Sequence, residues 1–446
     1  MWLSAIDERI KACMPVVSIG TFQSYIMGSN CVCELLPGGL TFTEESGILA
    51  MVAPRALKIG NGLLDKSKTF TPAEMIRSYT NAKPVFDLYN KAGNLNYQLF
   101  NTPHGYWPEM REAMLGWFDL KLKGTGDGGF KNEIPFTLIP PEKLMVFAKG
   151  QRDPKVVTTA GYCKEKGETF SRVFYGQKII DKEAKRKELC SLLLLREEPD
   201  IPGKAHAYES TGNWRNLILE TKGHHLVPLT YFPGITKAPV VIILSSDQNK
   251  INQSAIVNKY IQKGYGIVLA DVWGTGKYNS PEAKETDGIL PEYHTLSRAE
   301  WWLGHSVMGE WVNDINAISD YVTKNWAPSS LTIDADKELA VAALLQSAIN
   351  NNIDTCVLRT CPLSYVFDDR KGIDFFNMAI HIPEILQWGD ISLIAALSKK
   401  ACLVFRDPVS ISGNKIVGKE LEAFKEKFSE VKAACKTEAR FSFTDQ

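Results

Sequence analysis

The sequence predicts an α/β fold with a doubly wound, mostly parallel sheet, present as one partial copy followed by one near-complete copy. Short apolar runs alternate with amphipathic stretches of helical length, which is the pattern of a sheet covered by helices. This alternation starts twice, once near residue 11 and again near residue 204. We therefore expect one α/β segment over residues 1–124, a linker with a helix over 125–203, and a second α/β segment over 204–446.

The first segment, residues 1–124, holds three apolar runs and two helical patterns. The apolar runs predict buried strands at residues 13–20, 53–62 and 95–101. The helical patterns cover residues 73–93 and 107–124, and the first contains Pro84, a residue type that can kink a helix. Because strands and helices alternate, we expect the strands to pair in parallel.

The second segment, residues 204–446, repeats the pattern at greater length. Eight apolar runs predict strands, at residues 215–221, 225–232, 239–246, 265–272, 330–336, 354–360, 401–407 and 440–445. Helical patterns lie between several of these runs, at residues 254–264, 309–326, 338–351 and 418–436. An opening hairpin followed by strand–helix repeats of this kind has the element order of an α/β-hydrolase.

Composition excludes several classes of function. The chain has 446 residues, and 51 basic residues balance 51 acidic ones, so no basic surface is expected to track nucleic acid. No apolar stretch approaches the ~20 residues that span a bilayer, and the first residues lack the pattern of a signal peptide. Cys31 and Cys33 have no second cysteine pair at zinc-site spacing, and we expect neither a metal nor a cofactor.

The stretch "LGHSVMGEW" (303–311) begins like the G-x-S-x-G nucleophile elbow of serine hydrolases. Gly304 and Ser306 fit, but Met308 replaces the second glycine. The preceding residues "SRAEWW" lack the apolar run of the buried strand that an elbow requires. We therefore expect Ser306 to be an N-terminal residue of the following helix rather than a nucleophile.

The elbow of the second domain should follow the strand at 330–336. That position holds Ala335-Asp336-Lys337-Glu338-Leu339, without either glycine or the serine. The last histidine of the chain, His381, precedes the final two predicted strands, so none follows them as a catalytic base would. The sequence predicts a degenerate elbow at Asp336, Lys337 and Glu338, and a second domain without catalysis.

The first segment carries an acid and a base in the expected order. Asp65 follows the strand at 53–62, and His104 follows the strand at 95–101. Their separation, 104 − 65 = 39 residues, leaves room for one helix and one strand between them. Such an acid orients an imidazole that takes the proton of a nucleophile. A turn acid and an incidental loop histidine would give the same pattern, and nothing upstream in the chain supplies the serine.

Three stretches of the first segment, "MWLSAIDERIKACMPVVSIGTFQSYI", "APRALKIGNGLLD" and "PHGYWPEMREAMLGWF", together resemble the second half of an α/β-hydrolase of the acetyl xylan esterase type. Residues 204–446 resemble the same family again, through "GYGIVLADVWGTG", "LGHSVMGEWVNDINAISDYV" and "HIPEILQWGDISLIAALSKKACLVF". By this resemblance Asp65 and His104 match the family's acid and base. The resemblance also implies a nucleophile a few residues before Met1, and thus a truncated chain of a tandem hydrolase.

The function implied is that of a serine ester hydrolase acting on an acylated carbohydrate or another small ester, inactive while its nucleophile is missing. Association with the missing N-terminal segment is then expected. Two alternatives remain: a pseudo-hydrolase that binds a ligand or acts as a scaffold, and a fragment of a prolyl-oligopeptidase-like serine peptidase. Trp301, Trp302, Trp311 and Trp326 could line a sugar-binding surface, or could be core residues at helical spacing. The sequence does not assign a compartment, although relatives of this family are often exported.

Overall fold

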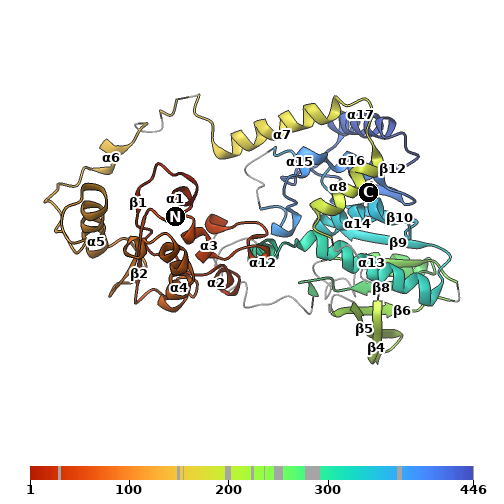
Figure 1. Ribbon diagram of the computed structural model, residues 1–446. Coiled ribbons are helices and arrows are strands. Elements are labelled where there is room, and N and C mark those ends of the chain that lie inside the picture. Colours follow the sequence, from red (N-terminus) through yellow and green to blue (C-terminus); the bar gives the residue numbers. More distant parts are fainter. Residues whose placement is uncertain are drawn as a thin grey trace. The chain divides into compact units, whose positions relative to one another are not determined.

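The chain forms two compact units in the computed structural model (Figure 1). The structure describes residues 1–28, 32–147, 151–153, 155–195, 202–221, 226–235, 237–245, 255–276, 292–368 and 374–444. Within these residues, unit 1 comprises Met1–Asp153 and Arg298–Gly304, and unit 2 comprises the rest. The segment expected as a linker, 125–203, is divided between the two units.

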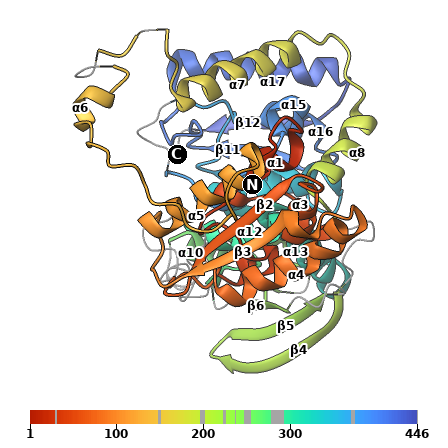
Figure 2. The same cartoon turned by 60° about the vertical axis from the view of Figure 1, so that its left-hand side comes forward.

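Unit 1 contains a parallel sheet whose described strands have the order β1-β2-β3 (Figure 2). The strands are β1 (Ala12–Cys13), β2 (Ala56–Gly62) and β3 (Leu95–Phe100). The helices are α1 (Trp2–Ile6), α2 (Phe22–Met27), α3 (Glu45–Ala50), α4 (Pro72–Leu88), α5 (Pro108–Phe118) and α6 (Pro141–Leu144). Short 3-10 helices cover Val32–Glu34, Gly39–Thr41 and Ala92–Asn94, and a π-helical turn covers Asp119–Lys123.

The predicted strands of unit 1 are confirmed at β2 and β3, but the run at 13–20 is mostly loop. Beyond β1, this run makes only an isolated bridge between Val16 and Gly60. Val17 has a φ of +46°, in the left-handed region that a β-branched residue rarely adopts, and this turn ends the pairing. The helix predicted over 73–93 continues through Pro84 and ends at Leu88.

Glu45, at the start of α3, places a carboxyl group in the core of unit 1. The residue is 0% exposed. The Tyr25 hydroxyl donates toward both of its oxygens, at 2.9 Å and 2.8 Å, and the backbone N–H of Gly20 donates to Oε2 at 3.0 Å. Burial raises the pKa of Glu45 to about 8, although the hydrogen bonds from Tyr25 and Gly20 act in the opposite direction. Glu45 is therefore a proton-bearing acid at neutral pH.

The sheet of unit 2 has nine described strands in the order β12-β11-β10-β9-β7-β8-β6-β5-β4. Pairing is parallel from β12 to β8 and antiparallel from β8 to β4. The strands are β4 (Pro202–Thr211), β5 (Trp214–Thr221), β6 (Leu226–Phe232), β7 (Val240–Leu244), β8 (Gly266–Ala270), β9 (Leu331–Asp336), β10 (Thr355–Arg359), β11 (Cys402–Arg406) and β12 (Arg440–Thr444). All eight strands predicted in this segment are therefore confirmed.

The described helices of unit 2 begin with two that precede the sheet, α7 (Thr159–Tyr175) and α8 (Lys182–Leu192). The others are α10 (Ala255–Gln262), α12 (His294–Trp302), α13 (Val307–Trp326), α14 (Lys337–Ile349), α15 (Ile385–Trp388), α16 (Ile391–Leu397) and α17 (Gly418–Ala434), with a 3-10 helix at Met378–Ile380. The residues of α12 from Arg298 onward belong to unit 1. None of the described helices is long and apolar enough to cross a bilayer.

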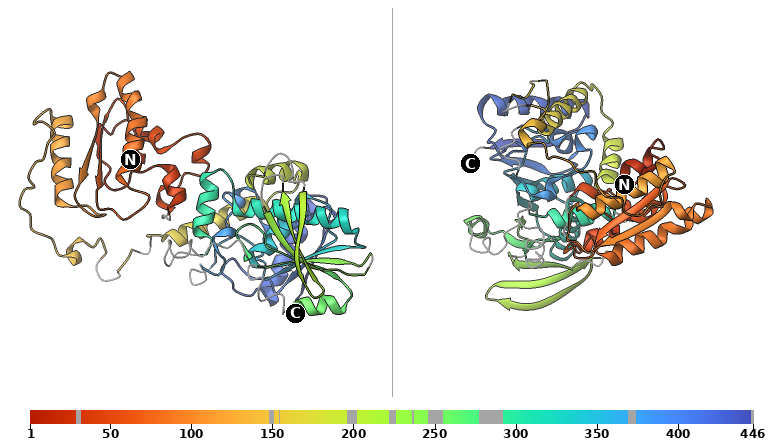
Figure 3. Two further views of the ribbon diagram at one scale, coloured as in Figure 1. Left: turned by 90° about the horizontal axis from the view of Figure 1, so that it is seen from below. Right: turned by 90° about the vertical axis from the view of Figure 1, so that its left-hand side faces the viewer.

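Strand β4 was not predicted from the sequence, because "PGKAHAYEST" contains no apolar alternation. It pairs only with β5, and the β4–β5 hairpin projects beyond the other strands of its sheet (Figures 2 and 3). Its residues from Lys204 onward are exposed. An edge strand whose side chains are mostly exposed leaves no strong hydrophobic pattern in the sequence.

The buried Glu45 predicts that unit 1 loses stability as pH rises. The folded state holds the proton up to about pH 8, whereas the unfolded carboxyl has a pKa near 4.5, so unfolding releases a proton between these values. The stabilisation is complete below pH 4.5 and decreases as pH increases toward 8. At pH 8, we expect Glu45→Gln to slow hydrogen–deuterium exchange of the β2 amides relative to wild type, and to do so less at pH 5.

Exposed Glu109, on α5, provides the matched control. Glu109→Gln should give the wild-type exchange rate at both pH values. An equal effect of Glu45→Gln at pH 5 and pH 8 would contradict a carboxyl that stays protonated at neutral pH.

Candidate functional site

Asp65 and His104 meet at the carboxyl-terminal edge of the unit 1 sheet. Strand β2 ends at Gly62 and β3 ends at Phe100, and these two residues are paired in the parallel register. Asp65 Oδ2 lies 2.7 Å from His104 Nδ1. The side chain of Asp65 is 1% exposed and that of His104 is 55% exposed. A buried acid thus holds an imidazole that is open to solvent.

Backbone hydrogen bonds join the two loops that carry this pair. Leu63 N–H donates to Phe100 O at 2.7 Å, and Leu64 N–H donates to Thr102 O at 3.1 Å. A β-carbon at Gly62 would lie 2.5 Å from Thr102 O, so the close approach of the loops requires glycine there. The separation of Asp65 from His104 is therefore set by the backbone as well as by their own hydrogen bond.

The acid is held from its other oxygen, and the base is held by an aromatic ring. Ser67 N–H donates to Asp65 Oδ1 at 2.9 Å. The ring of Phe70 stacks on the His104 imidazole, with centroids 5.9 Å apart and planes 29° apart. The carbonyl of Phe70 accepts a hydrogen bond from Asn61 Nδ2 at 3.2 Å, and Asn61 is fully buried. The loop after Asp65 thus fixes both members of the pair.

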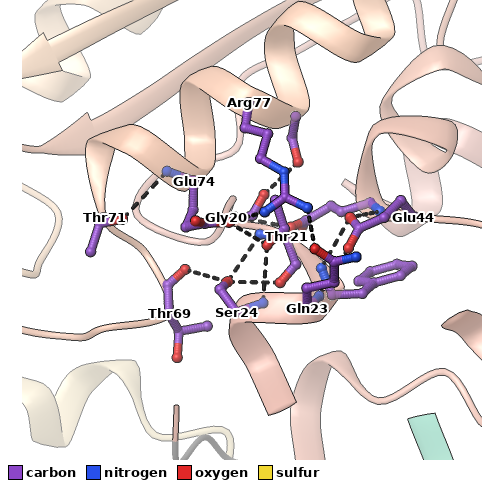
Figure 4. Close-up of polar contacts among 12 residues, drawn as sticks. Gly20, Thr21, Gln23, Ser24, Glu44, Thr69, Thr71, Glu74 and Arg77 are labelled. Carbon is purple, nitrogen blue, oxygen red and sulfur yellow. Dashed lines mark hydrogen bonds and ion pairs between the residues drawn. The ribbon is translucent and has the colours of Figure 1, made fainter. Parts of the chain in front are cut away.

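A polar network ties this loop to the start of α2 (Figure 4). Ser24 Oγ donates to Thr69 O at 2.9 Å, next to Phe70. Thr21 and Ser24 form a reciprocal cap, because the Ser24 N–H donates to Thr21 Oγ1 at 3.0 Å and the Thr21 N–H donates to Ser24 Oγ at 3.1 Å. The Thr21 hydroxyl also donates to Glu74 Oε2 at 2.5 Å, at the beginning of α4.

Glu44 completes the network from the other side of α2. Its carboxylate accepts from Phe22 N–H at 3.1 Å and from Gln23 N–H at 2.9 Å (Figure 4). These donors are the free N–H groups of the first helical turn, which a carboxylate stabilises. Sequence reasoning did not find these residues. The only local signal was the capping spacing of Thr21 and Ser24, which specifies a helix start and says nothing about a site.

The geometry suits proton transfer at the second imidazole nitrogen. A neutral imidazole that donates from Nδ1 to Asp65 has Nε2 free to accept a proton. The structure records no hydrogen bond from a Ser, Thr or Cys side chain to His104 among the residues it describes. Within those residues there is also no group of three or more His, Cys, Asp or Glu side chains placed to hold a metal ion.

The position of the elbow in unit 2 lies between β9 and α14, as the element order requires. Lys337 has a φ of +51°, the backbone strain that an elbow imposes on its central residue. Its ammonium group lies 4.6 Å from the ring centroid of Phe375. The Phe375 ring also covers Gly413, where a β-carbon would lie 2.2 Å from it. The turn is retained, while an aromatic side chain packs directly against its central residue.

The two acids beside Lys337 also have structural partners. Glu338 Oε1 accepts from Asn377 N–H at 2.6 Å, and burial raises the pKa of Glu338. Asp336 Oδ2 lies 3.9 Å from the guanidinium of Arg359.

Ser306 is the N-cap of α13, as the sequence predicts. Its hydroxyl accepts from Gly309 N–H at 3.0 Å and donates to Leu193 O at 3.1 Å. The tryptophans do not form one sugar-binding surface, which corrects that alternative. Trp302 is 1% exposed in a core of unit 1, and Trp311 is 1% exposed in the core of unit 2.

Comparisons with known proteins identify the fold. No protein-family model and no curated protein sequence matches the chain. A proposed acetyl xylan esterase from Bacteroides fragilis NCTC 9343 matches with a TM-score of 0.50 and 11% identity, over 66% of this chain and 82% of its own. Acetyl xylan esterases from Paenibacillus sp. R4 (TM-score 0.36, 11% identity, 58% and 85% covered) and Thermoanaerobacterium sp. JW/SL YS485 (0.35, 11%, 62% and 92%) also match. The chain has an α/β-hydrolase fold, and its structural neighbours are acetyl xylan esterases and other esterases.

Proposed function

We propose that unit 1 carries the acid and the base of a serine ester hydrolase, Asp65 and His104. The observation that supports this most is the contrast within the pair. The acid is 1% exposed, the imidazole is 55% exposed, and their contact is 2.7 Å long. An acid that only orients an imidazole works best out of water, whereas the imidazole must reach a substrate. An incidental surface pair would expose both side chains.

In this proposal His104 moves one proton in each half of the reaction. Nε2 accepts the proton of a serine hydroxyl as the oxygen attacks the ester carbonyl, and the imidazolium then gives it to the departing alcohol. Water next attacks the acyl-enzyme by the same route, which releases the acid and restores the serine. The Asp65 side chain accepts from Nδ1–H and stabilises the imidazolium in this step.

The substrate we propose is an acylated carbohydrate or another small ester. The resemblance of "APRALKIGNGLLD" and "PHGYWPEMREAMLGWF" to acetyl xylan esterases supports this class. The proposal requires a serine at His104 Nε2, and the described residues of unit 1 provide no such contact. We therefore propose that residues 1–446 by themselves do not turn over an ester at this pair.

The test compares hydrolysis of p-nitrophenyl acetate by residues 1–446 with that by the His104→Ala variant. We expect equal rates, because a base without a nucleophile has no proton to remove. If the gene encodes an elbow serine in frame ahead of residue 1, the longer polypeptide should be active. In it, His104→Ala should lower kcat/KM by at least about 10³-fold.

His206→Ala is the matched control, since His206 also pairs with a carboxylate, that of Glu220 at 3.5 Å, but lies on the exposed hairpin of unit 2. It should leave kcat/KM unchanged. A His104-dependent rate in residues 1–446 alone would show that the nucleophile has been misplaced. Unchanged activity of His104→Ala in an active longer polypeptide would refute the proposed base.

For unit 2 we propose a non-catalytic role. Lys337 stands where a nucleophile would stand, and its ammonium group contacts Phe375 rather than an open site. An acyl transfer at this turn would need a hydroxyl or thiol nucleophile together with a base. Residues 335–339 contain no hydroxyl or thiol. In this proposal the fold keeps the strained turn of an elbow although the turn carries no nucleophile.

This proposal predicts that the residue at position 337 affects the stability of the fold through backbone strain and does not affect ester hydrolysis. In an active longer polypeptide, Lys337→Ala should change neither the rate nor the selectivity of ester hydrolysis. The free energy of unfolding of Lys337→Gly should be about 1 kcal/mol larger than that of Lys337→Ala. Both variants lose the contact with Phe375, but only alanine keeps a β-carbon, which is strained at positive φ.

Denaturant unfolding of the two variants measures the difference. Equal stabilities would mean that the backbone at residue 337 is not strained. Loss of ester hydrolysis in Lys337→Ala would refute the non-catalytic role of unit 2.

A further inference from the structure

Unit 2 contains a cavity of about 530 Å³ that none of the residues Asp65, His104 or Lys337 lines. Helix α7 contributes Lys164 and Arg172 to its wall, and α17 contributes Phe424 and Lys427. The two helices lie side by side in Figures 1 and 2. Its size is that of a site for a small molecule.

The cavity lies at the edge of the sheet where α/β folds bind ligands. Its floor includes Ser364 and Asp368, which follow β10, and Ser410, which follows β11. The carboxyl ends of parallel strands are the usual place for a ligand in such sheets. None of the residues 335–339 lines it, so the cavity is separate from the degenerate elbow.

Most of the polar groups of the floor are already satisfied by the protein. Asp368 accepts from Ser412 N–H at 3.2 Å and from Asn414 Nδ2 at 3.0 Å. Burial alone would raise the pKa of Asp368, but these hydrogen bonds, together with those from the hydroxyls of Ser410 and Ser412, lower it overall. Ser364 donates to Asp390 at 2.5 Å. These groups shape the floor and leave little capacity for a ligand.

The cations of the wall are different, because none of them forms an ion pair within 4.0 Å among the described residues. The charge of Lys427 is felt by the buried Asp390, where it opposes the rise in pKa that burial causes. The Lys427 ammonium group lies 5.3 Å from the ring centroid of Tyr175 and 5.2 Å from that of Phe424. Lys425, two residues away on the same helix, pairs with Glu422 at 2.7 Å. Lys427 is partly buried, so an anion that meets it is less screened by water than at an open surface.

The remaining lining limits the charge and the shape of such an anion. Glu168 and Glu420 also line the cavity, are exposed, and pair with none of its cations. They would repel a multiply charged group such as a phosphate ester more than a single carboxylate. Phe367 and Phe424 offer flat apolar surface inside the cavity, which suits an aromatic body.

We propose that this cavity binds a small monocarboxylate with an aromatic body, its carboxylate paired with Lys427 and its ring against Phe424. The site is independent of Asp65 and His104, and it gives the non-catalytic unit a role in binding.

The test is calorimetric titration of the full chain with benzoate and with benzamide, which has the same ring and no charge. We expect benzoate to bind at least about tenfold more tightly than benzamide, and Lys427→Gln to remove this preference. Lys425→Gln, which alters a paired lysine of the same helix, should bind benzoate like wild type.

Arg172→Gln guards against a folding defect in the first variant, because Arg172 is exposed on α7 and its guanidinium donates a hydrogen bond to Thr169 Oγ1 at 3.3 Å without an ion pair among the described residues. It should weaken benzoate binding by a smaller factor at an unchanged melting temperature. Equal binding of benzoate and benzamide, no binding of either, or equal losses in Lys427→Gln and Lys425→Gln would overturn the proposal.

Discussion

The parallel hydrogen-bond ladder between β2 and β3 is the constraint on which the unit 1 site depends. It pairs Gly62 with Phe100 and so ends both strands at one edge. Asp65 lies three residues beyond the first strand end and His104 four residues beyond the second, and their side chains reach one another there. Asn61 and Ser24 then hold the loop between Asp65 and α4 by its carbonyl groups. The register of β2 and β3 brings Asp65 and His104 together, and the polar network holds the loop after Asp65 in place.

Unit 2 keeps the strand–turn–helix geometry of an elbow although residues 335–339 carry no serine. The turn between β9 and α14 still forces residue 337 to positive φ, because the strand and helix must join there at a sharp angle. Phe375 and Asn377 bind Lys337 and Glu338 in place of a substrate. A cavity of this unit lies beyond β10 and β11, where Lys427 faces the rings of Tyr175 and Phe424. Packing fixes the turn, and side-chain identity decides whether it can react.

The sequence could predict those features that periodic burial imposes. The eight strands predicted in unit 2 could be found because central parallel strands read as continuous apolar runs, as in "VVIIL" of β7, and because outer strands such as β5 alternate between buried and more exposed residues. Strand β4 and the loop at 14–20 could not be predicted, since the first buries little and the second depends on a positive φ at Val17. Asp65 and His104 could be singled out by their places after two strands. The contributions of Glu45, Asn61 and Phe70 could not, because each arises from contacts between residues distant in sequence.

The most direct measurement of the central claim is the tautomer of His104, read by ¹⁵N NMR of the full chain labelled at histidine. The 2.7 Å contact predicts that the neutral imidazole carries its proton on Nδ1 and leaves Nε2 unprotonated. Asp65→Asn should shift this tautomer signal while leaving that of His206 unchanged, because His206 contacts Glu220 elsewhere in the chain. A neutral imidazole protonated on Nε2, or a His104 spectrum unaffected by Asp65→Asn, would contradict the account of Asp65 and His104 as an oriented acid–base pair.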